Sequence, residues 1–160
     1  MSKKLSEYQK KRDFRKTDEP KGNNKSKKNK KPIFVIQKHD ASHLHYDFRI
    51  EMEGVLKSWA VPKNLSKNSS VKRLAVLTED HPMEYASFEG TIPEGEYGAG
   101  TVEIWDKGTF DNIREDELSL KESFKEGKIE IDLHGDKIQG PYVIIHYKNN
   151  EWLIKKMKKN

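Results

Sequence analysis

The sequence contains no cysteine and few hydrophobic residues. Without cysteine neither a disulfide framework nor a thiolate metal site can form, so any metal ion must take nitrogen and oxygen ligands. No apolar run approaches the roughly 20 residues of a membrane span, and residues 1–14 lack the apolar core of a signal peptide. Only 33% of the 160 residues are hydrophobic and 36% are charged, which predicts a compact core under an ionic surface. We expect one domain, located in the cytoplasm.

Positive charge is concentrated at the N-terminus. Residues 1–31 carry thirteen Lys or Arg against four Asp or Glu, a net charge of +9, whereas residues 32–160 have a net charge of −4. Such an arm favours a polyanionic partner, because lysines placed on phosphates release condensed counterions; a solubilising tail is the alternative. Residues 5–14 fit a short helix, and the lysine-rich residues 21–31 are too polar to order themselves. We divide the chain into an arm with its linker, 1–31, and a domain, 32–160.

From Pro32 onward, short apolar runs rich in β-branched residues alternate with turn residues. Their length and spacing predict seven or eight strands, in a sheet that is closed into a barrel or folded as a sandwich. Residues 115–127 depart from this pattern, with acids at the start and Leu120 and Phe124 four positions apart. Gly127 is a suitable C-terminal stop, so we expect a short helix there.

Three of the six histidines lie in residues 37–52, which read QKHDASHLHYDFRIEM. From residue 43 onward, apolar even positions alternate with polar odd positions, which predicts a strand with one face on the core and the other toward solvent or a cleft. The polar row consists of His43, His45, Asp47, Arg49 and Glu51. Same-face neighbours lie roughly 6.6 Å apart along a strand, so two of these side chains can converge on one ion.

His39 precedes this strand and could fold back onto the same ion. With His45 and Asp47 it would supply two imidazoles and a carboxylate, a set suited to Mn²⁺, Zn²⁺ or Fe²⁺ with positions left open for water and substrate. Arg49 stands next in the row, where a guanidinium could hold a metal-bound phosphate. The alternative is an ordinary wet strand face without a ligand.

A second group of candidates lies in EDHPMEY, residues 79–85. His81 and Tyr85 follow a predicted strand, a location where loops commonly deliver functional groups. Taken alone, His81 is more readily a turn residue before Pro82 and Tyr85 a half-buried core residue, so their role in a site depends on the first group.

Two long segments, FVIQKHDASHLHYDFRIEMEGVLKSWAVPK and LAVLTEDHPMEYASFEGTIPEGEYGAGTVEIWDKGTF, resemble the 3′-phosphoesterase domain of bacterial DNA ligase D and its free-standing archaeal and bacterial relatives. The similarity runs from about Arg12 to Lys156. It implies a mainly β fold: a small closed β-barrel of about eight strands, with one or two short helices, the basic N-terminal arm, and the site on the outer surface of the barrel.

The resemblance also assigns residues. The family's metal ligands match His39, His45 and Asp47, which would coordinate manganese, although zinc or cobalt also suits this set. The phosphate-contacting arginine matches Arg49, and the active-site histidine and tyrosine match His81 and Tyr85. The segment KRDFRKTDEP is similar to the family's N-terminal motif, whose functional residues fall on Arg12, Asp13 and Glu19. His43 stands where the family commonly has arginine, so one contact to nucleic acid would be weaker or pH-dependent.

The implied activity is repair of 3′ ends, in which a terminal ribonucleotide is trimmed to a 3′-phosphate and the phosphate is then removed to leave a 3′-OH. The implied partners are 3′ ends of DNA or DNA/RNA primer-templates, with a separate DNA ligase, polymerase and end-binding protein. We expect a monomer that contacts no membrane and finds its substrate without a covalent tether.

Two other functions start from the same residues. His45, Asp47 and His81 could form the 2-His-1-carboxylate site of a non-haem iron oxygenase, although His39, Arg49 and the arm would then lack a role. Alternatively, the chain is a non-catalytic nucleic-acid-binding barrel in which the basic arm does all the binding.

Other signals in the chain favour structural roles. The glycines of PEGEYGAG, residues 93–100, predict a turn rather than a phosphate cradle, because no Gly-Lys-Ser/Thr follows. The residues for which we expect structural roles are Trp59, Trp105, Trp152, His134 and His146, although an exposed tryptophan could stack a nucleobase.

Overall fold

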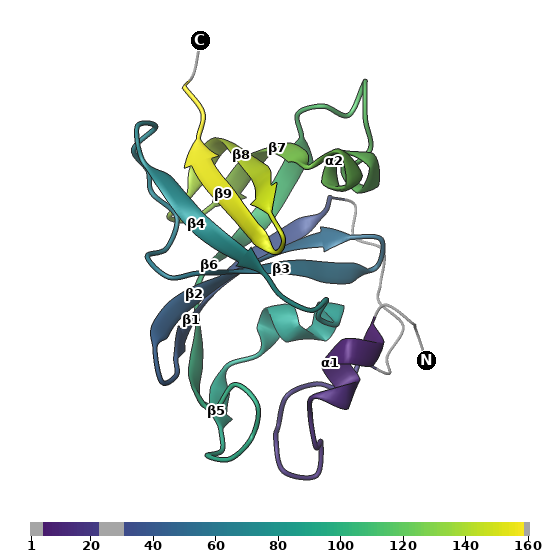
Figure 1. Ribbon diagram of the computed structural model, residues 1–160, viewed down its shortest axis with the longest axis vertical. Helices are drawn as coiled ribbons and strands as arrows, with labels where there is room; N and C mark the ends of the chain where they lie inside the picture. Colours follow the sequence, from purple (N-terminus) through teal and green to yellow (C-terminus); the bar gives the residue numbers. More distant parts are fainter. Residues whose placement is uncertain (1–4, 23–30, 159–160) are drawn as a thin grey trace.

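The computed structural model describes residues 5–22 and 31–158, and its main feature is a closed antiparallel β-barrel (Figure 1). Eight strands follow one another around it in the order β1-β2-β3-β4-β9-β8-β7-β6, and pairing of β6 with β1 closes the ring. The strands are β1 (Ile33–Asp40), β2 (Leu44–Met52), β3 (Val55–Val61), β4 (Lys72–Leu77), β5 (Gly90–Ile92), β6 (Gly100–Asn112), β7 (Lys128–Gly135), β8 (Gln139–Lys148) and β9 (Glu151–Lys156). The expected barrel is confirmed.

Strand β6 is longer than its neighbours, and its length creates an extension at one end of the barrel. One edge of β6 pairs with β1, from Thr101 to Thr109. The other edge pairs first with β5 and then, from Gly108 onward, with β7. The short strand β5 therefore lies outside the closed ring, at the bottom of Figure 1, and holds the loop 93–99 beside β1.

Two α-helices and one 3₁₀ helix accompany the strands in the described part of the chain. They are α1 (Ser6–Lys10), η2 (Met83–Ser87) and α2 (Leu120–Glu126). Helix α2 confirms the expected helix but begins later than residue 115, because Ser119 and Glu122 form a capping box and the acids before it lie in a turn. Gly127 ends it with φ +90°, as expected. No helix of the described ranges is long and apolar enough to span a membrane.

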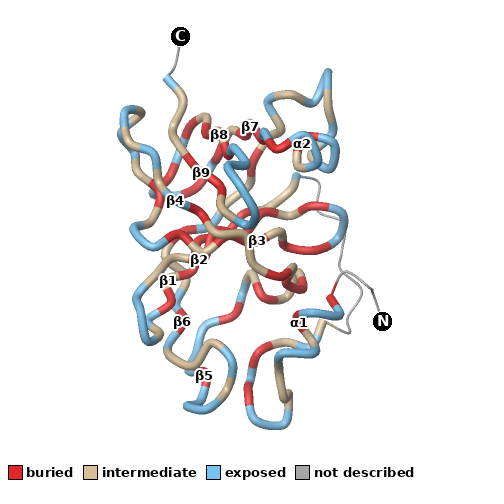
Figure 2. The backbone as a smooth tube through the Cα atoms, in the orientation of Figure 1, coloured by how far each residue is buried: buried red, intermediate tan, exposed pale blue. Residues whose placement is uncertain are grey.

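The hydrophobic residues form two clusters. The larger fills the barrel and includes Trp59 and Trp152, which are 0% and 3% exposed; the half-buried Trp105 packs against this cluster. The smaller cluster lies outside the ring, where Tyr8 of the arm packs with residues of β3, η2, β5 and β6. Buried stretches therefore occur in the arm as well as in the strands (Figure 2). Most of the expected linker, residues 23–30, lies outside the described residues.

Candidate active site and metal centre

The alternation of β2 directs its apolar residues into the barrel and its polar residues outward. Phe48 and Ile50 belong to the barrel core, so Asp47 and Arg49, which alternate with them, face the opposite side of the sheet. Asp47 and Arg49 are nevertheless only 6% and 3% exposed. The charged row therefore lies in a cleft, as the alternation allowed, rather than on an open surface.

The three predicted metal ligands converge. His39 lies directly opposite His45 in the pairing of β1 with β2. The Nδ1 atom of His39 is 3.5 Å from Oδ2 of Asp47, and Nε2 of His45 is 3.3 Å from Oδ1 of the same carboxylate. One ligand atom from each of the three residues lies within 4.8 Å of the others, a spacing that one divalent ion can bridge.

The ring nitrogens of both histidines are oriented for a cation. The Nε2 atom of His39 lies 2.7 Å from the carbonyl oxygen of Gly98, and Nδ1 of His45 lies 3.1 Å from that of His43. A carbonyl oxygen only accepts, so these nitrogens carry the protons. The lone pairs of His39 Nδ1 and His45 Nε2 therefore face the Asp47 carboxylate. Metal-binding histidines characteristically donate their other N–H in this way, and thus the residues fit a bound divalent cation.

Asp47 is held as a carboxylate. Burial alone would raise its pKa, but the nearby charge of Arg49 and the polar contacts with the imidazoles of His39 and His45 outweigh burial and lower the pKa well below its usual range. A permanently ionised carboxylate is the ligand that a hard divalent ion requires.

Arg49 extends the ligand row and has one free donor. Its Nε donates to Oε1 of Gln37 at 2.6 Å, and its Nη2 lies 3.4 Å from Oδ2 of Asp47. Its guanidinium carbon lies 4.7 Å from the centre of the Tyr85 ring. The remaining nitrogen, Nη1, is buried and has no hydrogen-bond partner among the described residues. A buried charged donor without a partner is costly, so Nη1 is placed to bind an anionic oxygen beside the metal ligands.

His81 is fixed by both its backbone and its ring. Its backbone exchanges two hydrogen bonds with Leu56 of β3, and its Nδ1 donates to the carbonyl oxygen of Glu79 at 2.9 Å. The lone pair of Nε2 therefore faces Nη2 of Arg12, 3.4 Å away. Burial, followed by the charges of Arg49 and Arg12, lowers the His81 pKa well below its ordinary value, which keeps the imidazole neutral.

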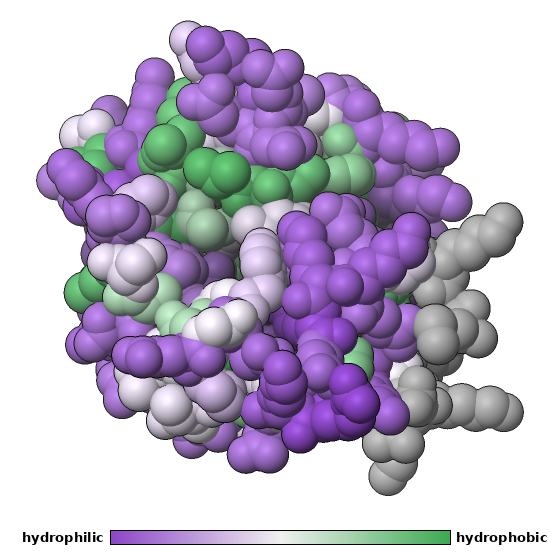
Figure 3. Space-filling model, turned by 60° about the horizontal axis from the view of Figure 1, so that its bottom comes forward, coloured by the Kyte–Doolittle hydropathy of each residue, from purple (hydrophilic) through white to green (hydrophobic). Residues whose placement is uncertain are grey.

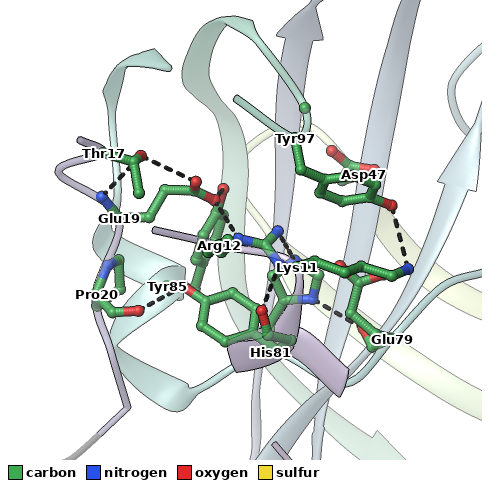
Figure 4. Close-up of polar contacts among 12 residues, drawn as sticks. Lys11, Arg12, Thr17, Glu19, Pro20, Asp47, Glu79, His81, Tyr85 and Tyr97 are labelled. Atoms are coloured by element: carbon green, nitrogen blue, oxygen red, sulfur yellow. Dashed lines mark hydrogen bonds and ion pairs between the residues drawn. The ribbon is translucent and has the colours of Figure 1, made fainter. Parts of the chain in front are cut away.

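Residues of the arm form a buried ionic network beside His81 and Tyr85 (Figure 4). Arg12 donates from Nε to Glu19 at 2.9 Å and from Nη1 to Glu79 at 3.1 Å, and all three side chains are at most 5% exposed. Glu19 also accepts a 2.7 Å hydrogen bond from the hydroxyl of Tyr85. Burial raises the pKa of Tyr85, so it remains a neutral donor. The arm is thus packed onto the site and is not merely a solubilising tail.

Asp13 is the one expected site residue that the structure does not bring to this group. Its carboxylate accepts from the backbone and the guanidinium of Arg15 at 3.1 Å. Because Arg15 is 89% exposed, this pair lies at the surface of the arm.

A cavity of about 300 Å³ connects the assembled groups. Its lining includes the three predicted metal ligands together with Arg12, Arg49, His81, Tyr85, Glu79, Tyr97 and Gly98. Loop 93–99 forms two successive turns, with hydrogen bonds from Glu96 to Pro93 and from Ala99 to Glu96. The predicted turn is confirmed, but it also contributes residues to the site. The face that carries β5 and the arm is mostly hydrophilic (Figure 3).

Sequence reasoning missed Gln37 and Glu79. The amide of Gln37 donates to the carbonyl oxygens of Tyr85 and Phe88 at 2.7 and 3.1 Å, which ties η2 to β1 while Oε1 receives Arg49. Glu79 lies in EDHPMEY, where the sequence predicts no role for it, and it is buried against Lys11 and Arg12 of the arm. The available signal for Gln37 was its odd position on β1, two residues before His39.

A second group of metal-ligand types lies on the outer face of the barrel. Asp111, Asp132 and His134 also bring ligand atoms within 4.8 Å of one another. Here Nε2 of His134 bonds directly to Oδ2 of Asp111 at 2.7 Å. His146, the other histidine expected to be structural, stacks on Trp152 with ring centres 4.9 Å apart.

Comparisons of the sequence with known proteins show the family of the chain. The sequence model of a family described as the DNA ligase D 3′-phosphoesterase domain matches residues 37–146. The chain is 48% identical over 154 residues to the multifunctional non-homologous end joining protein LigD of Mycobacterium bovis, covering 96% of the chain and 20% of that protein. The LigD protein of Pseudomonas aeruginosa is 46% identical over 162 aligned positions, covering 98% of the chain and 19% of that protein.

The chain spans about a fifth of the length of these relatives. The family match includes His39, β2 and residues 79–85, and the relatives' similarity extends over nearly the whole chain, arm included. The chain therefore belongs to the DNA ligase D 3′-phosphoesterase family.

Proposed function

We propose that the protein is a metal-dependent phosphoesterase that heals DNA 3′ ends. It removes a 3′-terminal ribonucleoside by phosphodiester cleavage and then removes the resulting 3′-phosphate, which leaves a 3′-OH for ligation or extension. The supporting observation is the buried His39, His45 and Asp47 group, whose lone pairs converge beside the unpartnered Nη1 of Arg49. That combination suits a divalent ion next to a phosphoester.

His39 Nδ1, His45 Nε2 and the Asp47 carboxylate would hold the ion, and we propose manganese, with zinc and cobalt suited to the same ligands. The bound ion supplies Lewis-acid charge at the phosphoryl group. Arg49 donates from Nη1 to a phosphoryl oxygen while Gln37 holds its Nε, so the guanidinium is already oriented before substrate binds. Such preorganised positive charge accounts for most catalysis of phosphoryl transfer.

His81 and Tyr85 complete the cavity. The negative charge of a bound phosphoester would raise the His81 pKa, because an opposite charge favours the protonated form. His81 then donates from Nε2 to the phosphoryl or leaving oxygen. Arg12, whose Nη2 faces that nitrogen in the absence of substrate, then donates to the phosphoester instead. The neutral phenol of Tyr85 holds Glu19 and thereby fixes the arm beside the reacting group.

The substrate that we propose is the 3′ end of a DNA or DNA/RNA primer strand. The relatives' names describe multifunctional non-homologous end joining proteins, so we propose that the healed hydroxyl passes to a ligase or polymerase.

The test uses an end-labelled primer-template with a 3′-ribonucleotide, incubated with and without manganese. We expect two products to appear in order, the primer with a 3′-phosphate and then with a 3′-OH, and both to vanish with a chelator. His45→Ala should form neither, whereas His134→Ala, the matched change in an exposed histidine, should retain both. Manganese-independent processing, or full turnover by His45→Ala, would contradict the proposal.

The two alternative functions are a non-haem iron oxygenase and a non-catalytic nucleic-acid-binding barrel. Among the described residues the convergent ligand group contains His39 rather than His81, so the geometry does not favour the iron oxygenase. A non-catalytic binding barrel would bind primer-template equally with chelator present and would leave 3′ ends unprocessed.

A further inference from the structure

A second cavity adjoins the active-site cavity and is not used by the chemistry above. Its volume is about 340 Å³, which is within the range of roughly 300–1,000 Å³ for small-molecule sites. Thr78, Glu79 and Tyr97 line both cavities. We call the second one the side cavity; it is further lined by Glu7 and Lys11 of the arm, Leu77, and Asn150 at the tip of the β8–β9 hairpin.

The charges of the side cavity favour an uncharged ligand. Lys11 is the only cationic side chain among the described residues that line it. Its Nζ already lies 3.2 Å from Oε1 of Glu79 and 3.4 Å from Oε1 of Glu7. A strand of phosphodiesters binds through cations that are available to its phosphates. This cavity offers two carboxylates and no spare cation, so it does not suit the charged strand.

The polar groups of the side cavity are nevertheless suited to hydrogen bonding. The Glu7 side chain is 68% exposed. The carbonyl oxygen of Asn150 accepts from the Leu77 amide at 2.7 Å, which holds the hairpin tip in place, and its side-chain amide has no partner within the described ranges. Tyr97 is 47% exposed, its hydroxyl lies 3.4 Å from Lys11 Nζ (Figure 4), and it lines both cavities.

We propose that the side cavity receives the ribonucleoside that leaves during phosphodiester cleavage, an inference that rests on the proposed function. In that step a water oxygen bonds to phosphorus, the bond from phosphorus to the 5′ oxygen breaks, and that oxygen takes up a proton. The departing ribonucleoside is uncharged. The Glu7 carboxylate accepts hydrogen bonds from its ribose hydroxyls, as acidic residues do in dinucleotide sites, Asn150 binds the nucleoside through its amide, and the Tyr97 ring stacks on the base.

This assignment separates the two reactions of the site. A 2′-OH that binds in the side cavity distinguishes a terminal ribonucleotide from a deoxyribonucleotide. Removal of a 3′-phosphate involves no leaving nucleoside, so it does not use the side cavity. Variants of the side cavity should therefore affect one reaction and spare the other.

The kinetic test compares Glu7→Gln and Asn150→Ala with the wild-type protein on two primers. Asn150→Ala removes a hydrogen bond and Glu7→Gln weakens one by removing the charge of its acceptor, each a loss of about 1 kcal/mol, so kcat/KM for ribonucleoside release should fall about fivefold. The rate of phosphate release from a primer with a 3′-phosphate should not change. Glu126→Gln is the matched control. Glu126 is a partly exposed carboxylate at the end of α2, away from the site, and it pairs with Arg114 at 2.9 Å.

A binding measurement tests the side cavity without catalysis. In a titration followed by amide NMR, adenosine should shift Thr78, Tyr97 and Asn150 at lower concentration than 2′-deoxyadenosine does. Equal losses in both reactions, losses in neither, or no preference for adenosine would overturn the inference. A wild-type protein that releases neither product would overturn the proposed function instead, and the adenosine titration would then decide on the side cavity by itself.

Discussion

Two clusters of histidine and carboxylate in this protein have similar composition and different chemistry. His39, His45 and Asp47 lie in a cleft on the outer side of β1 and β2, and Asp111, Asp132 and His134 lie on β6 and β7. In both clusters the ligand atoms lie within 4.8 Å of one another. Proximity of ligand atoms therefore does not distinguish them.

The position of the proton on each histidine ring distinguishes the two clusters. In the buried cluster backbone carbonyls take the N–H groups of His39 and His45, so bare lone pairs face the carboxylate. In the exposed cluster His134 uses Nε2 to bond the carboxylate of Asp111, and Lys31 adds a cation 3.6 Å from the same residue. In the exposed cluster the histidine is bonded to the carboxylate, whereas in the buried cluster two ring nitrogens are left for the cation that we propose. We infer that orientation by the backbone, more than residue type, makes a metal site.

The largest expected effect comes from neutralising one carboxylate in each cluster. Asp47→Asn should lower manganese-dependent 3′-end processing at least about a thousandfold, or roughly 4 kcal/mol, because the ion loses its only anionic ligand. Asp132→Asn should leave the rate unchanged. Rates on a 3′-phosphate primer check both, and similar losses in the two variants would remove the distinction between the clusters.

The next effect comes from removing one cation from each region, Arg12 in the active-site cavity and Lys31 beside Asp111. Arg12→Gln leaves Glu19 and Glu79 buried without their guanidinium, which should weaken docking of the arm by roughly 3 kcal/mol. Hydrogen exchange should then rise at residues 5–22. Lys31→Gln breaks only a surface pair and should change stability by less than about 0.5 kcal/mol. Unchanged protection of the arm in Arg12→Gln would show that the network does not hold it.

A smaller effect should follow from moving one backbone carbonyl. Gly98 has φ +78°, and its carbonyl oxygen accepts a hydrogen bond from His39. Gly95 in the same loop has φ +89°, and a Cβ atom added there would contact no other atom. Alanine at either position costs about 1 kcal/mol of strain. Only Gly98→Ala should weaken manganese binding, by about tenfold. Calorimetric titration checks this, and equal affinities in the two variants would contradict the orienting role of Gly98.

The smallest effect should come from the exposed histidine. His134→Ala removes an exposed pair with Asp111 and should lower the free energy of unfolding by less than about 0.5 kcal/mol. Urea denaturation measures this. A loss above about 2 kcal/mol would mean that the exposed cluster contributes to the barrel's stability in a way that its exposure does not explain.

Much of the site could be predicted because it follows one strand. The alternation in β2 places His45, Asp47 and Arg49 on one face whatever the rest of the chain does, and His39 follows from the antiparallel partner strand. The short strand β5 and helix η2 carry no comparable periodicity, since three and five residues are too few to show one.

The burial of the site could not be predicted in the same way. Arg12 meets Glu79 across 67 positions of sequence, and only the folded barrel brings these segments together. The resemblance placed Arg12, Asp13 and Glu19 in the site, and the structure brings Arg12 and Glu19 there while Asp13 pairs with Arg15 at the surface. Glu79 carries no local pattern that marks it, and Gln37 only its position two residues before His39 on β1, because their roles arise from contacts with η2 and the arm.

The most direct test of the metal centre is anomalous diffraction at the manganese edge from crystals grown with manganese. We expect one full-occupancy peak per chain, within bonding distance of His39 Nδ1, His45 Nε2 and the Asp47 carboxylate. A peak only at Asp111, Asp132 and His134, or no ordered peak beside Asp47, would contradict the account.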